Sequence, residues 1–462
     1  MLFHTWRFFG FLVVVLALFY LLPERARRLL LLLASYYFYM CWNPKFILLI
    51  LVLTFIDYQA ALLIESSAPR WRKTALVVSL SANLGLLGFF KYYNFFAESL
   101  ARLIGVAPDS YLLAIILPLG ISFHTFQSMS YVIDVYRRQQ APIRNPVDYA
   151  LFIAFFPQLV AGPIVRAREF FGDLYHWKPP SSEEVRRGVL LIALGLAKKA
   201  VFADQAARIA DRYFTAPANY PGVLPAWSAA ASFIAQVYFD FSGYTDMAIG
   251  MALLFGFRFP ENFRRPFLSD CMTEYWQRWH MSLSRWLRDY LFFPLGGRSR
   301  NRWRVFASLM ITLLLAGLWH GAAWHFVLWG GLLGLIIVFE RSLGIRPLKP
   351  RDPLLLKLVR IPLAFAVFVG AGVLFRVPSL HDAGIVYSNM FSLVGGAPGL
   401  QGWQVALALL ALGLAVAEEW IGWFERLVTA PRWVPACALG LVFLTVELFS
   451  VTDPMPFVYF QF

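Results

Sequence analysis

Two histidines lie in sequence settings that suit acid–base chemistry. His320 stands between Gly317 and Gly321 inside an apolar run, and His280 lies forty residues earlier in a stretch rich in tryptophan and arginine. A general base needs a neutral imidazole with access to its substrate, and apolar surroundings favour the neutral ring near pH 7. Each histidine also has a plainer interpretation, His320 as a hydrogen-bond donor between packed helices and His280 as an amphipathic ring at the level of the lipid headgroups.

Two carboxylates form a second candidate group. Asp240 and Asp246 lie inside the apolar run 224–257, where a charge is costly and usually faces a pathway or a partner. Gly243 lies between them and is expected to allow a bend. The alternative is that these carboxylates pair with arginines or cap a broken helix.

Several other chemistries find no support in the sequence. His320 and His325 are five residues apart, which separates their directions on a helix by about 140°, so they do not form the one-faced pair of a zinc site. The three cysteines, Cys41, Cys271 and Cys437, form no ligand-like pair. Phosphate-binding loops and the GxSxG motif of serine hydrolases do not occur. We therefore expect no metal site.

The elements that position these residues must be membrane helices. Of the 462 residues, 59% are hydrophobic and 15% are charged, whereas a soluble domain is about 45–50% apolar and about 25% charged. This composition excludes a soluble enzyme, a disordered chain and a secreted disulfide scaffold. At about 20 residues per crossing, the apolar residues would supply roughly 10–12 membrane spans.

The charge pattern predicts an orientation. The net charge of +14 could suggest a nucleic-acid partner, but the basic residues lie in short loops between apolar runs, as the positive-inside rule describes. Three alternate loops, 23–28, 65–73 and 137–146, hold nine basic residues, and the three segments on the other side hold four. We therefore expect no nucleic-acid partner, an N-terminus outside the cell and these basic loops in the cytoplasm.

The apolar run 305–339 is too long for one straight span. Its 35 residues include no Asp, Glu, Lys or Arg and would extend about 52 Å as a helix, against a hydrocarbon core of about 30 Å. The segment must bend, re-enter or form two pieces, with the break expected at 317–321. Counted from Arg304, His320 would lie about 24 Å along the helix and well inside the membrane. Broken backbone at that depth is tolerated where it is buried in protein or lines a cavity.

The segment 266–297 is too polar to span and is expected to form a helix lying in the membrane interface. Its large side chains recur at three- and four-residue steps, which places them on one helix face: Trp276, Trp279, Leu283, Trp286 and Tyr290. Two pairs of opposite charge are four residues apart, Glu274–Arg278 and Arg285–Asp289. Interface packing is the commoner use of such a face, and a ligand cage is the alternative.

A basic run follows this segment, with arginines at positions 298, 300, 302 and 304. It is a topology signal in the simplest interpretation, and it could also attract the phosphates of a cytosolic donor. The residues alone leave two classes, a membrane enzyme with histidine chemistry and a transporter with broken helices. The breaks are concentrated in 224–339, which counts against the two corresponding halves of a transporter.

The candidate residues lie in motifs that resemble a known family. Glu274-Tyr-Trp-Gln-Arg-Trp-His280, continued by Leu283-Ser-Arg-Trp-Leu-Arg-Asp-Tyr290 and followed by Gly317-Leu-Trp-His320-Gly, is similar to the membrane-bound O-acyltransferase (MBOAT) family. The match is to its bacterial branch typified by the alginate O-acetylation membrane protein. Further similar stretches extend the resemblance over nearly the whole chain: 121–136, 156–163, 238–250 and 459–462.

The resemblance implies a fold and a site. The fold would be an all-α polytopic membrane protein with roughly 10–12 spans, plus re-entrant or interfacial helices around a central tunnel. It would form one domain over 1–462, with N-terminal helices in 1–165, the catalytic motifs in 224–339 and C-terminal helices in 358–462. His320 matches the catalytic histidine and His280 the second histidine position, which would orient the donor or stabilise an oxyanion. Substrate-positioning roles are expected for the neighbouring polar and aromatic residues: Trp319, Asp240, Asp246, Trp279, Arg285, Arg288 and Asp289.

The resemblance also implies a reaction. The expected activity is transfer of acetyl groups from cytosolic acetyl-CoA, without a tightly bound cofactor, for O-acetylation of an exopolysaccharide such as alginate or of a cell-wall glycan. The expected setting is the bacterial inner membrane, among lipids, with an extracytoplasmic SGNH-like acetyltransferase and polysaccharide synthesis machinery as partners. The alternatives are a D-alanyl transferase of the teichoic-acid type and a transporter of an acylated intermediate.

Overall fold

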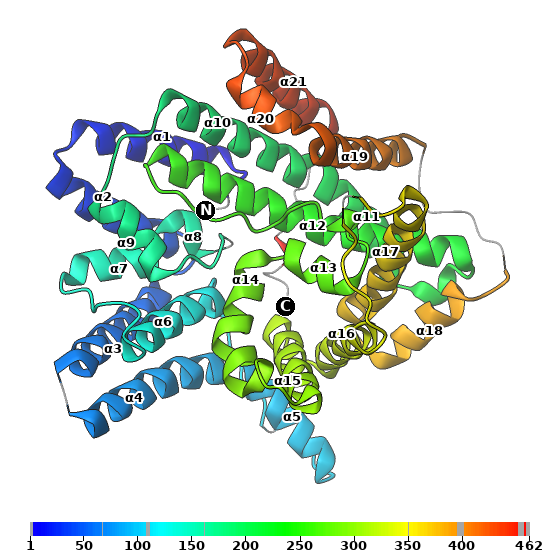
Figure 1. The fold of residues 1–462 in the computed structure, drawn as a ribbon, viewed down its shortest axis with the longest axis horizontal. Coiled ribbons are helices and arrows are strands. Elements are labelled where there is room, and N and C mark those ends of the chain that lie inside the picture. Colours follow the sequence, from blue (N-terminus) through cyan, green and yellow to red (C-terminus); the bar gives the residue numbers. More distant parts are fainter. Residues whose placement is uncertain are drawn as a thin grey trace. The chain divides into compact units, whose positions relative to one another are not determined.

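The computed structural model describes residues 3–66, 68–107, 111–160, 162–349, 351–394, 402–450 and 457–458. Within these ranges the regular secondary structure is helical throughout (Figure 1). The chain divides into two compact units, and the division falls within helices α10 and α12. Residues 459–462, which contribute to the family resemblance, lie outside the described ranges.

Unit 1 contains residues 1–189 and 247–260. Its helices are α1 (Trp6–Leu21), α2 (Glu24–Met40), α3 (Ile47–Ser66), α4 (Pro69–Leu87), α5 (Tyr93–Leu103), α6 (Ile121–Tyr136), α7 (Pro146–Ala154), α8 (Phe156–Leu159), α9 (Ala167–Tyr175) and the first half of α10 (Ser182–Ala197). A π-helical turn, Gly88–Tyr92, joins α4 to α5. The buried carboxylate of Asp57 on α3 accepts hydrogen bonds from Ser79 and Asn83 on α4, which ties these two neighbouring helices together.

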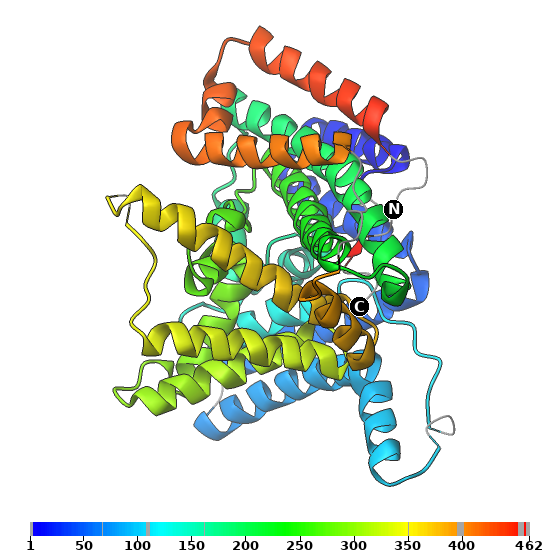
Figure 2. The same cartoon turned by 90° about the vertical axis from the view of Figure 1, so that its right-hand side faces the viewer.

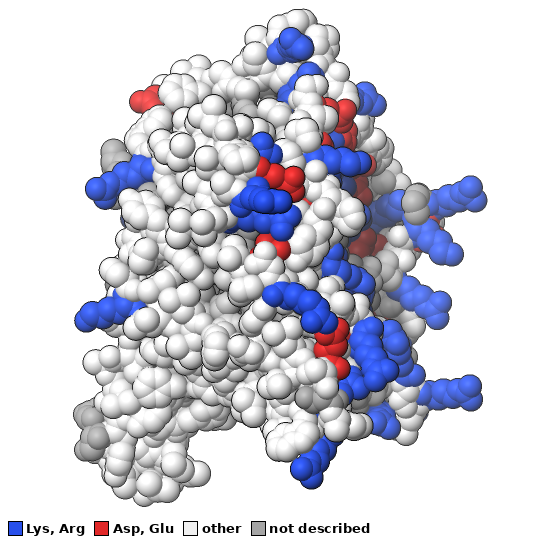
Figure 3. Space-filling model, turned by 90° about the vertical axis from the view of Figure 1, so that its left-hand side faces the viewer, with Lys and Arg blue, Asp and Glu red and all other residues white. Residues whose placement is uncertain are grey.

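The three basic loops of unit 1 lie at one end of its helices. Arg28, after the first loop, pairs with Asp148 at the start of α7, and Arg144 pairs with Glu65 at the end of α3. Arg72 donates to the backbone carbonyl of Tyr136 at the end of α6. On the face seen in Figure 3, many Lys and Arg side chains lie toward one edge, others lie in the middle of the face and at the opposite edge, and large areas are uncharged. The three basic loops therefore share one end of the helices of unit 1, as the alternation used to predict the orientation requires.

Unit 2 contains residues 190–246 and 261–462. Its helices are α11 (Asp204–Phe214), most of α12 (Val223–Leu254), α13 (Met272–Arg278), α14 (Met281–Leu287), α15 (Arg302–His320), α16 (Trp324–Ser342), α17 (Leu354–Arg376), α18 (Leu380–Met390), α19 (Gly402–Ile421), α20 (Trp423–Thr429) and α21 (Trp433–Phe449). Two π-helical segments, Lys198–Ala203 and Arg288–Gly297, precede α11 and follow α14. Short 3-10 turns occur at Pro217–Asn219 and Pro266–Leu268.

Six helical segments among the described residues are long and apolar enough to cross a membrane: Pro44–Ser66, Pro69–Leu103, Arg302–His320, Trp324–Ser342, Leu354–Arg376 and Gly402–Ile421. Two shorter apolar helices are α1 and α21. The chain is thus an all-α multi-pass membrane protein, as its composition predicts.

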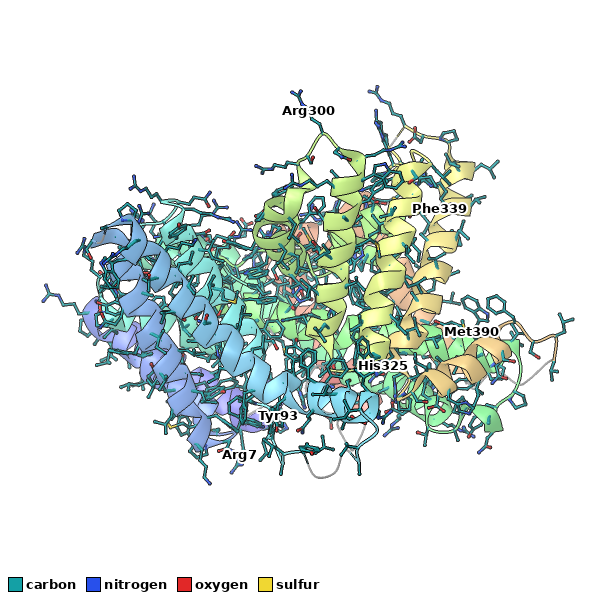
Figure 4. All side chains as sticks on the ribbon, turned by 90° about the horizontal axis from the view of Figure 1, so that it is seen from below. Arg7, Tyr93, Arg300, His325, Phe339 and Met390 are labelled. Carbon is teal, nitrogen blue, oxygen red and sulfur yellow. The ribbon has the colours of Figure 1, made fainter. Side chains whose placement is uncertain are left out.

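The apolar run 305–339 forms two antiparallel helices, α15 and α16, separated at Gly321–Ala323. Asn301 caps α15 by accepting a hydrogen bond from the Trp303 amide (2.9 Å). Figure 4 shows Arg300 at one end of this pair and His325 at the other. The predicted break is confirmed, but each piece is long enough to span, so His320 ends a full helix.

Small residues bring α15 and α16 into close contact. A Cβ on Gly317 would lie 2.2 Å from the carbonyl oxygen of Phe326, and one on Gly330 would lie 2.2 Å from that of Leu313. Backbones can approach this closely only where side chains are absent, as in many membrane helix pairs. Helix α17 packs on α16 in turn (Figure 2).

Two sequence expectations about helix shape are wrong. The helix does not break at Gly243, because α12 is continuous over its 32 residues; this glycine instead allows close approach to Gly195, whose carbonyl oxygen would lie 2.7 Å from a Cβ added at position 243. The segment 266–297 is not one interfacial helix. It breaks at His280, whose φ of 42° is left-handed, and its face residues Leu283 and Trp286 are buried within unit 2.

Candidate active site

His320 is the last residue of α15 and is held in an aromatic environment. Its side chain is buried, and its imidazole lies 5.3 Å from the ring of Trp329 on α16 and 5.2 Å from that of Phe375 on α17. Both neighbours meet the imidazole at steep angles, 89° and 69°. Residues from three consecutive helices therefore surround His320.

His280 lies between α13 and α14 and is fully buried. The ring of Phe241 on α12 lies edge-on at 4.7 Å, and the side-chain oxygen of Asn262 lies 3.2 Å from Nδ1. His280 is outside the six candidate spans, and burial lowers the pKa of its imidazole. The ring is therefore neutral near pH 7, which also suits acid–base or hydrogen-bonding chemistry.

Trp319 brings the two histidines into one site within unit 2. Its ring lies 6.1 Å from that of His280 and 4.9 Å from that of His320. Two histidines forty positions apart in the chain thus both have their rings next to a single buried indole. This juxtaposition depends on the break at His280 and on the position of His320 at the end of α15.

The short helix α13, which leads to His280, is anchored from α16. The carboxylate of Glu340 accepts hydrogen bonds from the backbone amides of Met272 (2.7 Å) and Thr273 (3.0 Å), and from the Thr273 hydroxyl (2.9 Å). These amides have no partner within their own helix, so an acceptor at this end stabilises it. The ion pair between Glu274 and Arg278, 2.9 Å, was predicted from their spacing and is confirmed.

The other predicted positioning residues of 279–289 lie on or beside the helices that follow Trp279. Trp279 is buried beside His280 and stacks on Tyr275 at 5.5 Å. Arg285 lies half-buried on α14. Arg288 and Asp289 are on the π-helical segment beyond it and form an ion pair with each other at 2.8 Å.

The carboxylates on α12 pair with lysines of the π-helical segment Lys198–Ala203. Asp246 pairs with Lys198 at 2.5 Å, and buried Asp240 lies 3.1 Å from Nζ of Lys199. Asp204 also binds Lys199, at 2.7 Å. Asp240 further accepts a hydrogen bond from the amide of Val458 at 2.6 Å. The two carboxylates therefore form ion pairs, as the alternative interpretation predicted, although their partners are lysines and not arginines.

Two polar residues of this region were not singled out in the sequence. Lys199 lies inside an apolar run, and a cation there should have been matched to Asp240 in the neighbouring run. Nothing in the sequence around Asn262 indicates its role, because it lies in an ordinary loop after α12. Its role depends on His280 and Ser282, which pack against it only in the folded chain. Both are almost fully buried, at 1% exposure.

Residues 31–354 match the model of the membrane-bound O-acyltransferase family, MBOAT, and include both histidines. The chain therefore belongs to the membrane-bound O-acyltransferase family and is a membrane acyltransferase.

Among its relatives is a protein named probable alginate O-acetylase AlgI from Pseudomonas aeruginosa, 41% identical over 389 residues, which are 83% of this chain and 73% of the relative. A peptidoglycan O-acetyltransferase from Helicobacter pylori is 35% identical over 77% of this chain and 72% of its own length. A teichoic acid D-alanyltransferase from Bacillus subtilis is 31% identical over 46% of this chain and 56% of its own length.

Proposed function

We propose that this protein transfers acetyl groups for O-acetylation of an exopolysaccharide or cell-wall glycan. The observation that carries the proposal is the placement of the His280 and His320 rings next to the same buried residue, Trp319. The relatives that match most of the chain are named as O-acetylating proteins of alginate and peptidoglycan, which supports the acetyl group and the glycan acceptor.

In the proposed reaction His320 is the general base. Neutral His320 takes the proton from an acceptor hydroxyl as its oxygen attacks the thioester carbonyl of the donor. The new C–O bond forms, the C–S bond breaks, and the leaving thiolate receives the proton from the His320 imidazolium. His280 contacts the donor or the reacting carbonyl, and the surrounding aromatic rings keep water from the acyl group.

The donor, the partners and the cellular site belong to the same proposal. Acetyl-CoA is the proposed donor, entering from the cytoplasmic side of the bacterial inner membrane, and no tightly bound cofactor is needed. The proposed partners are an extracytoplasmic SGNH-like acetyltransferase and the polysaccharide synthesis machinery. A D-alanyl donor on a carrier protein is the rival, supported by a match over less than half of the chain.

The test is a pair of histidine variants in purified protein reconstituted into liposomes with labelled acetyl-CoA. We expect His320→Ala to lose transfer, because no group remains to accept the hydroxyl proton. His325→Ala is the matched control: it is the next histidine along the chain, and its Nδ1 donates to the carbonyl of Leu374 at 2.9 Å. Normal transfer by folded His320→Ala protein would overturn the assignment.

A second measurement separates the donors. The same liposomes are supplied either with acetyl-CoA or with a D-alanyl carrier-protein thioester. We expect turnover with acetyl-CoA, and turnover with the charged carrier alone would favour the rival. Movement of an acylated intermediate across the bilayer without any transfer would instead support a transporter.

A further inference from the structure

We propose that Asn262 is a positioning residue that holds His280 in the tautomer with its proton on Nδ1, so that Nε2 presents a lone pair to the substrate. The consequence for catalysis rests on the proposed function of His280, whereas the tautomer itself rests on the structure alone. His280 would then accept a hydrogen bond from the substrate and would not donate one to an oxyanion.

Asn262 contacts His280 and the residues that follow it. Its side-chain oxygen lies 3.2 Å from Nδ1 of His280, and it accepts hydrogen bonds from the Ser282 amide (3.1 Å) and the Ser282 hydroxyl (2.8 Å). Its backbone carbonyl accepts from the amide of Met281 at 2.8 Å. Asn262, His280 and Ser282 are 1%, 0% and 2% exposed, so bulk water does not compete for these groups.

The backbone amide of Ser282 determines which way the Asn262 side chain faces. A backbone N–H can only donate, so the Asn262 atom facing it must be the carbonyl oxygen and not the amide nitrogen. That oxygen can only accept. The nitrogen of His280 that faces it must therefore carry a proton, which places the N–H at Nδ1.

A neutral imidazole carries a single N–H. With the proton on Nδ1, Nε2 of His280 has only its lone pair, and the ring would need to become cationic to donate from Nε2. The surroundings oppose a cation, because the ring is buried and lies edge-on to Phe241 at 4.7 Å. Nε2 is thus an acceptor, and stabilisation of an oxyanion must come from another group.

Asn262 also maintains the backbone conformation of His280. The left-handed φ of 42° is unfavourable for a residue with a side chain and persists only where neighbouring contacts require it. The bonds from Asn262 to Met281 and Ser282 supply those contacts directly after the turn. The side chain and the backbone carbonyl of Asn262 therefore determine how the His280 ring is oriented and which of its nitrogens carries the proton.

The first experiment measures the tautomer by nitrogen-15 NMR of histidine-labelled protein in lipid nanodiscs. The His280 signals are assigned by their loss in His280→Gln. We expect a protonated Nδ1 and an unprotonated Nε2 in the wild type, the same tautomer in Asn262→Asp, and a mixed or reversed tautomer in Asn262→Ala. A wild-type ring protonated at Nε2 would overturn the proposal even if neither Asn262 variant folds.

The second experiment compares transfer by the same variants. We expect Asn262→Ala to lower kcat about 10- to 100-fold, the loss that follows when the partner that orients a metal-bound histidine is removed, and Asn262→Asp to restore part of it. The control is Asn389→Ala, which removes a half-buried asparagine bonded to Tyr213 and Pro217 in the same unit. Wild-type kcat in folded Asn262→Ala protein would contradict the positioning role.

The two experiments separate this inference from the proposed function. If His320→Ala retains transfer while His280 has the expected tautomer, the general-base proposal fails and the tautomer assignment stands. If His320→Ala loses transfer but the wild-type tautomer is reversed, the proposed function stands and this inference fails.

Discussion

The ring of Trp319 lies 6.1 Å from that of His280, at an interplanar angle of 61°. Because Trp319 directly precedes His320, this contact joins the turn between α13 and α14 to the end of α15 within unit 2. The buried indole presents apolar surface to both imidazoles, and so it has a structural role and, in the proposed reaction, a role in excluding water.

Replacement of Trp319 by alanine is expected to increase wasteful hydrolysis of the donor. The lost indole leaves space beside both histidines, water can enter, and the acyl group is hydrolysed rather than transferred. Trp319→Phe retains an apolar ring, so most of the acetyl-CoA that it consumes should still lead to transfer and not to hydrolysis. The measurement is the ratio of free acetate to transferred acetyl from labelled acetyl-CoA.

The control for this prediction is Trp303→Ala, on the first turn of the same helix, where the indole is 67% exposed. It removes an equal side chain without opening the site. Equal hydrolysis ratios for Trp319→Ala and Trp303→Ala would contradict the water-excluding role.

Gly317→Ala is expected to destabilise the α15–α16 pair. The added Cβ would lie 2.2 Å from the Phe326 carbonyl oxygen, and backbone there cannot yield without separating the helices. Overpacking of this kind costs about 1–3 kcal/mol. The measurement is the thermal unfolding midpoint in one detergent.

Gly370→Ala on α17 is the matched control, because a Cβ there meets nothing within 4 Å. Alanine in a helix is favoured over glycine by about 0.5–1 kcal/mol, so this variant should be at least as stable as the wild type. Equal midpoints for the two alanine variants would show that the close approach is not needed.

Lys199→Met is expected to lower stability strongly. It leaves the buried carboxylates of Asp204 and Asp240 beside each other without their shared cation, and breaking a buried pair in this way costs about 3–5 kcal/mol. The double variant Lys199→Met/Asp240→Asn should recover part of the loss. The stability of the purified variants is measured by thermal inactivation.

Lys198→Met serves for comparison, because the Lys198–Asp246 pair is partly exposed, at 28% and 21%. An exposed pair contributes about 0–1 kcal/mol, so this variant should lose less. A larger loss in Lys198→Met than in Lys199→Met would contradict the assignment of the buried cluster.

Glu184 is expected to make the start of α10 sensitive to acid. The amide of Ser181 donates to its carboxylate at 2.8 Å, as does Arg258 at 2.8 Å, and first the amide and then the guanidinium lower the pKa of Glu184. A carboxylate with a lowered folded-state pKa stabilises the fold above its unfolded pKa of about 4.3 and loses this contribution as pH falls through the folded value.

The measurement for Glu184 is the difference in unfolding midpoint between wild type and Glu184→Gln across acid pH. We expect the difference to be present at pH 7 and to disappear as the pH falls below about 4. Glu183→Gln, at the exposed neighbouring position, is the control. A difference for Glu184→Gln that does not change with pH would contradict the prediction.

Local patterns in the sequence were sufficient for several features. The charge-free length of 305–339 required a break, and the glycines on either side of His320 placed it correctly. The spacing of Glu274 and Arg278 predicted their ion pair. These features depend on residues close in the chain, so their physical cause is visible in the order of the amino acids.

Other features failed because their cause lies elsewhere in the chain. The periodicity of 266–297 is helical throughout, but contacts with Asn262 allow the left-handed conformation of His280 that breaks the helix. In the sequence alone Gly243 suggests a hinge, whereas in the structure it allows close packing against Gly195. The partners of Asp240 and Asp246 lie in a π-helical segment that periodicity does not reveal.

The sequence by itself determined that this protein is an all-helical membrane protein, since its apolar content and short basic loops are typical of helices that lie in a lipid bilayer. Its motifs also identified the two histidines. The tertiary structure decided that both histidines lie beside Trp319, that Asn262 faces Nδ1 of His280, and that Lys199 binds both Asp204 and Asp240. Such relationships depend on side-chain directions from separate helices, and only packing sets those directions.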